Sequence, residues 1–290
     1  MNVRTFIAAA ALLTVTGTLS AQTDVSLFWR SDSVQISEII TPEADQYKKV
    51  GHHGPAVENM YMGLRIYFNN SGSIDVYSKQ KPQLELAAAH WYPSLQQQRE
   101  EGFGCDEYKV GKTVGLGGYN LWDGEKILPL EATEGREVRV NKTENGATAE
   151  MLAKGVPYKN KKVDILIRIT MLNDERWAWV EAFSVKGGKV QFVTGVNFHP
   201  GNSKTFTDEE GHIAVWAKHP ADVSQNPIPI GGGMVYPTGA IDEKRLTADA
   251  ILVISRPAKH FKTKVVSAGS REAELNHADA FIKYVSSLLY

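Results

Sequence analysis

Two adjacent histidines in a glycine-bounded segment are the least ordinary chemistry-bearing residues of the sequence. His52 and His53 lie between Gly51 and Gly54. Histidine can act as an acid, a base or a metal ligand near neutral pH, and glycine lets a backbone approach a ligand closely. Neighbouring side chains of an extended chain point to opposite faces, so both imidazoles meet at one point only if the segment twists. The alternative is a surface loop in which one histidine satisfies a backbone group.

A second polar group lies on a predicted β-hairpin. Residues 62–68 and 73–77 alternate between apolar and polar side chains on either side of the turn sequence Asn-Asn-Ser-Gly. On the polar face an arginine can pair with a carboxylate, and a phenol can transfer a proton or stack on a sugar. A solvated sheet face is the alternative. The residues of this face are Arg65, Tyr67, Asp75 and Tyr77.

Other segments offer aromatic and polar candidates. Trp91 and Tyr92 precede a proline, and such a pair forms either a sugar-stacking platform or a buried aromatic anchor. Single polar residues occur in a glycine-punctuated loop, on the polar face of the strongest predicted strand and at the end of another strand. Each of them has a solvated or structural role as its alternative. These residues are Asp106, Lys109, Arg168 and His199.

The sequence predicts neither a metal site nor a cofactor. It has no His-x-x-x-His or paired-cysteine spacing. The acidic run 208–210 could hold a hard cation, with a charged surface turn as the alternative. No Lys-Ser/Thr follows the glycines 231–233, segment 115–118 fails the dinucleotide fingerprint, and there is no Gly-x-Ser-x-Gly elbow.

The first residues have the pattern of an export signal. Residues 1–4 carry positive charge, 6–13 are apolar, and Ser20 and Ala21 are small. We predict a signal peptide over residues 1–21, with a buried N-terminal helix as the alternative. The apolar run is shorter than the roughly 20 residues of a membrane-spanning helix. We therefore expect a periplasmic or secreted protein that is not an integral membrane protein.

Composition limits the expected partners, the disulfides and the number of domains. The 32 basic and 33 acidic residues give a net charge of −1 without a basic block, so nucleic acid is not an expected partner. Cys105 is the only cysteine, so the fold cannot contain an internal disulfide, and we expect this thiol to be buried. Residues 22–290 show no linker or repeat, which favours a single β-sandwich domain.

Strands separated by turns dominate the predicted secondary structure. Short strands with close turn spacing are typical of a β-sandwich. The last residues instead have helical spacing, with Ser270 as a plausible N-cap. The fold class predicted is therefore mainly β, a sandwich or supersandwich with a C-terminal α-helix. Besides the first hairpin, strands are expected within 138–140, 147–152, 163–171, 177–185, 190–198, 212–217, 248–255 and 262–267.

Seven short segments carry a family resemblance. They are HHGPAVEN at 52–59, RIYF at 65–68, IDVYSK at 74–79, LEL at 84–86, WYP at 91–93, GLGG at 115–118 and WDG at 122–124. Together they resemble one exported bacterial family, long labelled a domain of unknown function and found beside polysaccharide-degradation genes. The resemblance covers nearly all of residues 22–290 and is most specific in the first third. Near Gly269 the sequence departs from the family, since Ser270-Arg271 stands where a glycine-tryptophan pair is expected.

This resemblance implies a galactose-mutarotase-like supersandwich with catalysis on a concave sheet face. Some members resemble ulvan-oligosaccharide dehydratases, which implies a carbon–oxygen lyase acting on uronic-acid-containing oligosaccharides. The reaction would be β-elimination at a terminal uronate, and the expected partner is the oligosaccharide substrate. The alternatives are a polysaccharide lyase, an epimerase or a hydrolase on the same fold, and a non-catalytic glycan-binding protein.

Such an elimination needs three kinds of group. An arginine, Arg65 or Arg168, neutralises the carboxylate, a histidine takes the C5 proton, and a tyrosine protonates the departing oxygen. The catalytic candidates are His53, His52, Arg65, Tyr67 and Tyr61. The substrate-binding candidates are Glu58, which is expected to orient a histidine, together with Trp91, Tyr92, Asp106, Arg168 and His199.

Overall fold

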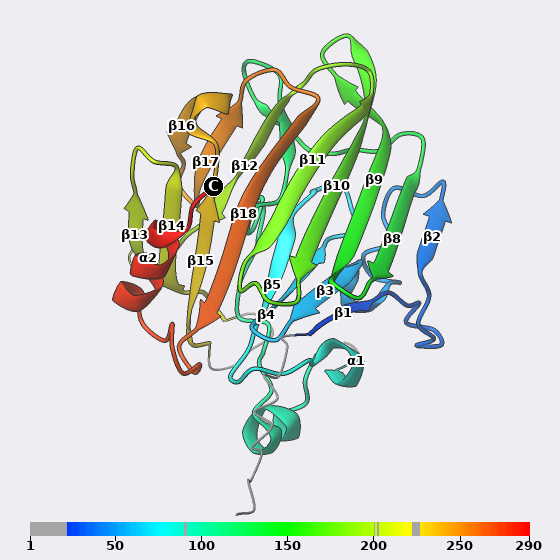
Figure 1. The fold of residues 1–290 in the computed structure, drawn as a ribbon. Helices are drawn as coiled ribbons and strands as arrows, with labels where there is room; N and C mark the ends of the chain where they lie inside the picture. Colours follow the sequence, from blue (N-terminus) through cyan, green and yellow to red (C-terminus); the bar gives the residue numbers. More distant parts are fainter. Residues whose placement is uncertain (1–21, 90–91, 200, 202, 222–226) are drawn as a thin grey trace, which may run out of the picture.

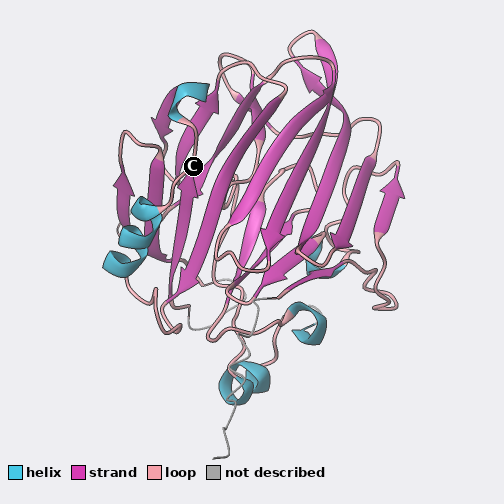
Figure 2. Cartoon of the chain, viewed as in Figure 1, coloured by secondary structure: helices cyan, strands magenta, loops and turns pink. Residues whose placement is uncertain are grey.

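The protein is built mainly from antiparallel β-strands (Figures 1 and 2). The computed structural model describes residues 22–89, 92–199, 201, 203–221 and 227–290. Three sheets and a C-terminal helix confirm the predicted fold class. The predicted signal peptide, residues 1–21, and Trp91 lie outside the described residues.

The largest sheet has nine strands and lies at the front of Figure 1. Its long central strands confirm the strands expected within 147–152, 163–171, 177–185 and 262–267. In sheet order its strands are β13 (Ser203–Thr207), β14 (His212–Lys218), β15 (Pro229–Val235), β18 (His260–Gly269), β11 (Ala178–Lys186), β10 (Lys161–Leu172), β9 (Gly146–Tyr158), β8 (Arg136–Lys142) and β2 (Glu38–Thr41).

Two smaller sheets lie behind the large one (Figure 1). The four-stranded sheet consists of β1 (Thr23–Ser26), β3 (Ala56–Asn59), β4 (Met62–Ile66) and β5 (Ile74–Ser78). The five-stranded sheet consists of β16 (Ile241–Leu246), β17 (Ala250–Ser255), β12 (Gln191–Asn197), β6 (Asn120–Trp122) and β7 (Ile127–Leu128).

A single large core joins the three sheets. Every second residue of β10 from Val163 to Met171 is fully buried, as period-two alternation requires. The same core takes Leu64 from β4, Val76 from β5 and Phe192 from β12. The opposite faces of β4 and β5 are thereby left for the polar residues of the hairpin.

The C-terminal helix α2 (Ala278–Ser287) packs on the outer face of the large sheet (Figure 1). The prediction that Ser270 caps it was wrong. Ser270 donates its backbone N–H to Pro229 at 3.0 Å and so continues the strand pairing. His277 is the N-cap instead, and its ring accepts from the N–H of Ala280.

Gly231 and Gly233 serve helix packing, and their strand, β15, was missed from the sequence. A Cβ at Gly231 would lie 2.8 Å from ring carbons of Phe281, and one at Gly233 would lie 2.5 Å from Val285. The absence of side chains therefore lets α2 approach the sheet closely, with Phe281 and Val285 fully buried.

Replacing Gly231 by alanine is expected to lower the free energy of unfolding by about 1–3 kcal/mol, because the new methyl overpacks against Phe281. Urea unfolding measures the loss. Gly239→Ala is the matched control, since nothing lies within 4 Å of its added Cβ. Equal stabilities of the two variants would contradict the packing role.

The remaining helical elements are short. They are η1 (Gly51–His53), α1 (Leu86–Ala89), the π-helical turn η2 (Gln97–Glu101) and η3 (Thr238–Ala240). Among the described helices, none has the length and apolar character needed to cross a membrane.

Candidate functional site

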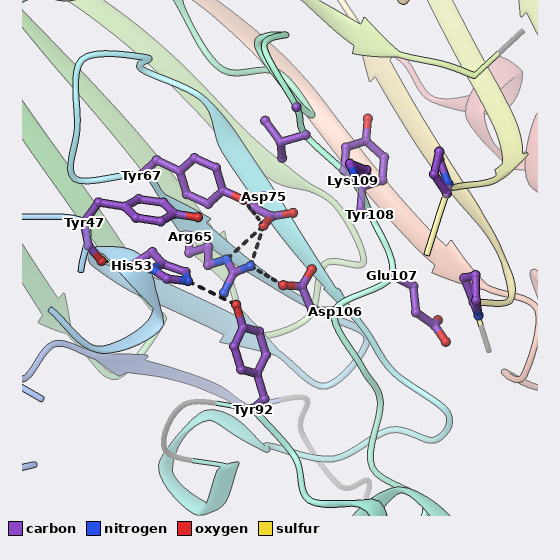
Figure 3. A pocket seen from close by; sticks show the side chains of 14 residues that line it. Tyr47, His53, Arg65, Tyr67, Asp75, Tyr92, Asp106, Glu107, Tyr108 and Lys109 are labelled. Atoms are coloured by element: carbon purple, nitrogen blue, oxygen red, sulfur yellow. Dashed lines mark hydrogen bonds and ion pairs between the residues drawn. The ribbon is translucent and has the colours of Figure 1, made fainter. Parts of the chain in front are cut away.

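Arg65 lies at the centre of a polar cluster on the outer face of the four-stranded sheet (Figure 3). The register of β4 and β5 sets Arg65 directly opposite Asp75. Its Nε and Nη2 donate to Asp75 Oδ2 at 3.1 and 2.5 Å, and its Nη1 donates to the Tyr77 hydroxyl at 2.8 Å. Nη2 also forms an ion pair with Asp106. The residues predicted on one polar face of the hairpin therefore do lie together in the structure.

The charge of Arg65 is compensated inside the wall of the site. The side chain is 1% exposed. Burial alone would lower the pKa of Arg65, but the carboxylates of Asp106 and Asp75 outweigh it and raise the pKa above its ordinary value. A guanidinium held between two carboxylates has little net charge left to attract a substrate carboxylate.

Tyr67 is held by the same cluster. Its hydroxyl donates to Asp75 Oδ2 at 2.5 Å. Burial and then the charge of Asp75 raise the pKa of Tyr67 far above its ordinary value. The phenol therefore stays protonated, and its one proton is committed to Asp75.

The two histidines adopt left-handed backbone conformations, with φ of 53° at His52 and 63° at His53. Such angles are uncommon outside glycine and cluster at functional sites. A Cβ at Gly54 would come within 1.9 Å of the Ile66 carbonyl oxygen, so only glycine fits against β4 there. The segment therefore twists, as convergence of the two imidazoles requires.

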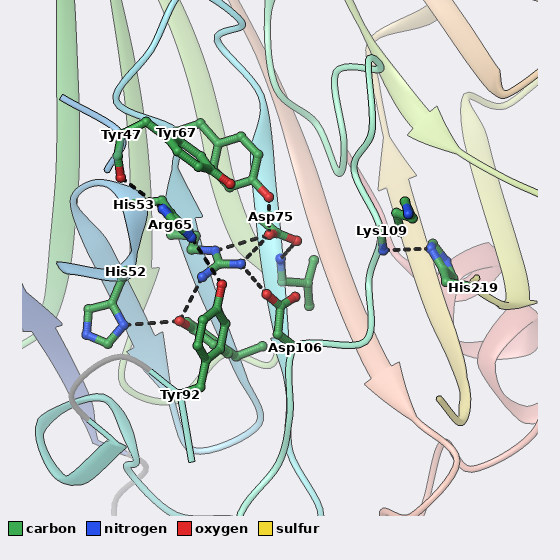
Figure 4. A network of polar contacts seen from close by, with 12 residues as sticks. Tyr47, His52, His53, Arg65, Tyr67, Asp75, Tyr92, Asp106, Lys109 and His219 are labelled. Atoms are coloured by element: carbon green, nitrogen blue, oxygen red, sulfur yellow. Dashed lines mark hydrogen bonds and ion pairs between the residues drawn. The ribbon is translucent and has the colours of Figure 1, made fainter. Parts of the chain in front are cut away.

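His52 and His53 reach the cluster from different sides (Figure 4). His52 is fully buried, with Nδ1 3.1 Å from the Tyr77 hydroxyl and Nε2 3.1 Å from Ser26 Oγ. His53 is half-buried and stacks on the Tyr47 ring at 3.8 Å between ring centroids. His53 lines the cavity described below, whereas His52 is not among its lining residues.

The hydrogen bonds of His53 fix its tautomer. Nδ1 lies 2.9 Å from the backbone carbonyl oxygen of Tyr47, which can only accept, so Nδ1 carries the proton. In the neutral ring Nε2 then bears the lone pair and accepts from the Tyr92 hydroxyl at 3.1 Å. Tyr92 is thus the hydrogen-bond partner of a potential base.

The pKa of His53 gives a pH prediction. Burial lowers it from 6.5 to about 4; the bond to the Tyr47 carbonyl opposes this shift, and the charge of Arg65 favours it. The unfolded chain then binds more protons between these values. The stability gained from neutral His53 is therefore complete above about pH 6.5 and declines as the pH falls toward 4. NMR titration of the ring C–H is expected to show a midpoint near pH 4, and a midpoint near 6.5 would contradict this environment.

These side chains line a cavity of about 330 Å³ (Figure 3). The wall facing His53 and Tyr92 comes from the segment 106–111. The lining residues are Tyr47, His53, Arg65, Tyr67, Asp75, Tyr92, Asp106, Glu107, Tyr108, Lys109, Val110, Gly111, Pro220 and Pro227.

The backbone of Lys109 is held from both sides (Figure 4). Its N–H donates to His219 Nδ1 at 3.0 Å, and its carbonyl accepts from Asn197 Nδ2 at 2.7 Å. His199 Nε2 lies 3.0 Å from the same His219 nitrogen, so His199 stands behind this wall and does not line the cavity. Lys109 is thereby placed as the second cation of the cavity lining, in addition to Arg65.

Three sequence candidates lie away from this cavity. Glu58 does not orient a histidine; its buried carboxylate pairs with Lys79 and accepts the N–H groups of residues 85 and 86. Tyr61 stacks against Arg176 at a different cavity. Arg168 pairs with Glu150 at 2.5 Å on the outer face of the large sheet.

Sequence reasoning missed Tyr47 and His219, which both belong to the site. Tyr47 lies in a polar segment without periodicity, so no local sequence pattern predicts that it stacks on His53. His219 had a weak sequence signal, because His199 and His219 each precede a proline. In the structure these two histidines are hydrogen-bond partners.

The acidic run 208–210 contributes to the one group of potential metal ligands found among the described residues. Ligand atoms of Asp208, Glu210 and His212 lie within 4.8 Å of one another. However, Asp208 Oδ2 already contacts His212 Nδ1 at 2.7 Å, and its Oδ1 accepts the N–H groups of Glu210 and His212. These contacts are the internal hydrogen bonds of a turn, and they already occupy both carboxylate oxygens of Asp208.

Solved structures with distant similarity come from carbohydrate-active proteins. A mutant heparan sulfate lyase from Pedobacter heparinus is 10% identical, with a TM-score of 0.35, over 74% of this chain and 33% of the lyase. A 4-alpha-glucanotransferase from Thermococcus litoralis is 13% identical, with a TM-score of 0.38, over 81% of this chain and 40% of that one. A Klebsiella pneumoniae protein assigned as an aldose 1-epimerase is 10% identical, with a TM-score of 0.33, over 91% of this chain and 94% of that one.

The first two of these proteins are much longer, and this chain spans only about a third of the lyase and 40% of the glucanotransferase. Similarities this distant carry no statement about what this chain binds or converts. No curated protein matches the sequence. The family described as Domain of unknown function (DUF4861) matches residues 15–289, nearly the whole chain. The protein therefore belongs to the DUF4861 family.

Proposed function

We propose that the chain is a carbon–oxygen lyase that catalyses β-elimination at a terminal uronate of an oligosaccharide, as in the dehydration of ulvan-type fragments. The observation that carries the proposal is the hydrogen bonding of His53. Nδ1 is held by the Tyr47 carbonyl, and Nε2 faces the Tyr92 hydroxyl at the wall of a polar cavity. A neutral imidazole with a fixed lone pair is what a general base requires.

The proton at C5 of the uronate is the one removed. Tyr92 takes it through its oxygen while its own proton passes to His53 Nε2, a path that their 3.1 Å contact permits. The C5–H electrons form the C4=C5 double bond, and the C4–O bond breaks. The proton on His53 returns through Tyr92 to the leaving oxygen, so that water or a sugar hydroxyl departs.

Lys109 is the group proposed to neutralise the substrate carboxylate. Lys109 lines the cavity on a backbone held by His219 and Asn197, and the charge of Arg65 is shared between Asp75 and Asp106. A cation near the carboxylate stabilises the charge that develops when C5 loses its proton. Arg65 acts as a positioning residue that holds Asp75, Asp106 and, through Nη1, Tyr77.

The balance of charge favours a second candidate, epimerisation of a neutral sugar. The lining contains three carboxylates, Asp75, Asp106 and Glu107, against the two cations Arg65 and Lys109. Epimerisation uses the same histidine and tyrosine for proton transfer but needs no group to neutralise a substrate carboxylate.

The test is ultraviolet absorbance during incubation with saturated and polymeric uronate-containing oligosaccharides. Growth of the band of a 4,5-unsaturated uronate is expected, and product masses then distinguish loss of water from loss of a sugar. A flat trace with every uronate would refute the elimination. NMR measurement of anomer exchange in neutral sugars then tests epimerisation, and binding without any turnover would leave a glycan-binding protein.

We also propose that the protein is exported to the periplasm or the medium. The support is the charged, apolar and small-residue order of residues 1–21. N-terminal sequencing of the protein recovered outside the cytoplasm is expected to begin at or near Gln22. An intact Met1 on all recovered protein would refute export by cleavage.

A further inference from the structure

A second cavity, of about 90 Å³, lies at the other end of strand β4 from the first. Tyr61, which directly precedes β4, forms part of it together with Pro82 and the loop after β18. It shares no lining residue with the cavity around Arg65. Its volume exceeds the roughly 30 Å³ that one water occupies in the liquid.

An incomplete ion pair forms the polar wall of this cavity. Arg176 Nη2 pairs with Glu272 Oε2, and both side chains are 10% exposed. In a bidentate pair the neighbouring Nε and Oε1 would bond as well. Here Arg176 Nε and Glu272 Oε1 are both buried and have no hydrogen-bond partner. One donor and one acceptor of the same ion pair are thus left unsatisfied, and burial makes this costly.

The chemistry of the two atoms selects the ligand. A hydroxyl group accepts from Arg176 Nε and donates to Glu272 Oε1 at once. An anion would bind the Arg176 guanidinium but would be repelled by the Glu272 carboxylate. A cation would bind the carboxylate but would be repelled by the guanidinium. Lys79 pairs with Glu58, and the other two charged lining residues, Lys81 and Glu274, have opposite signs. The cavity therefore suits a neutral group.

We propose that this cavity is a second carbohydrate-binding site, which takes a hydroxyl-bearing edge of a neutral sugar ring between Arg176 and Glu272. The Arg176 guanidinium lies 4.7 Å from the centroid of the Tyr61 ring. This ring supplies a rigid aromatic wall. The site does not depend on the reaction proposed for the first cavity. On an oligosaccharide, two sites of this kind would raise affinity through effective concentration.

The experiment follows the Arg176 Nε–H resonance of the full chain by 1H–15N NMR while methyl β-glucopyranoside is added. A saturable shift of this resonance is expected. Glu272→Gln, which replaces the open acceptor by an amide, is expected to weaken binding by about tenfold or more. Ala273→Leu fills the cavity without touching the ion pair and is expected to abolish the shift even if the Gln variant folds poorly.

Asp279→Asn is the matched control. Asp279 lies in helix α2, is 77% exposed, pairs with Lys204 and is not among the lining residues of the cavity, so its loss should leave the affinity within about twofold, as for an exposed ion pair. No shift with the glycoside would overturn the proposal and leave water as the occupant. A shift with inorganic phosphate but not with the glycoside would overturn it in favour of an anion site. Neither result would bear on turnover at the first cavity.

Discussion

Turnover is expected to fall by roughly 10²- to 10⁴-fold when His53 is replaced by alanine, the range typical of a lost general base. The physical reason is that Nε2, 3.1 Å from the Tyr92 hydroxyl, is placed to accept its proton. Tyr92→Phe, which removes one oxygen atom, is expected to cause a loss of similar size. Initial rates of unsaturated-product formation measure both.

Two comparisons separate chemistry from folding. His260→Ala removes an exposed histidine that pairs with Glu181 on the outer face of the large sheet, and it should leave the rate unchanged. Added imidazole should restore part of the activity of His53→Ala, since the cavity has room for it, but should not rescue Tyr92→Phe. The smallest loss of rate expected for His53→Ala is roughly 10²-fold. A rate within about threefold of the wild-type rate would exclude the proposed proton path.

The free energy of unfolding is expected to fall by about 3–5 kcal/mol when Arg65 is replaced by methionine. The substitution leaves the carboxylates of Asp75 and Asp106 buried without their cation. Urea denaturation at neutral pH measures the change. Combining Arg65→Met with Asp75→Asn and Asp106→Asn should recover much of the loss, because the uncompensated charges are then gone.

Arg168→Met is the matched control for this change. Arg168 and Glu150 also form a cross-strand ion pair, but their side chains are 36% and 21% exposed. Water compensates either charge there, so a cost of about 1 kcal/mol or less is expected. Similar losses for the two arginines would contradict the view that burial sets the importance of Arg65.

Alternation made the central strands and the first hairpin predictable. In β10 the buried residues recur with period two, and the same rule placed Arg65 and Asp75 on one face of the hairpin. Strand β15 was missed because three glycines carry no side-chain pattern. Strand β16 alternates in exposure but is polar and lies at a sheet edge, so its sequence resembles a loop.

The pairings that complete the site could not be predicted in the same way. His53 ends the short helix η1 and Tyr92 lies in a distant loop, and no local pattern connects them. Glu58 was expected to orient a histidine, yet the distant Lys79 determines its surroundings. Local periodicity gives the face on which a side chain lies, whereas the contact between two loops depends on the whole fold.

The position of β18 within the large sheet has a consequence for how the chain reaches this fold. β18 lies between β11 and β15, although β12 to β17 separate it from β11 in sequence. The sheet therefore cannot close until a long loop has been ordered, which places refolding in the slow range of milliseconds to seconds or beyond. Until β18 docks, β11 and β15 each expose an unpaired edge, so intermediates at this stage are the ones expected to aggregate during refolding.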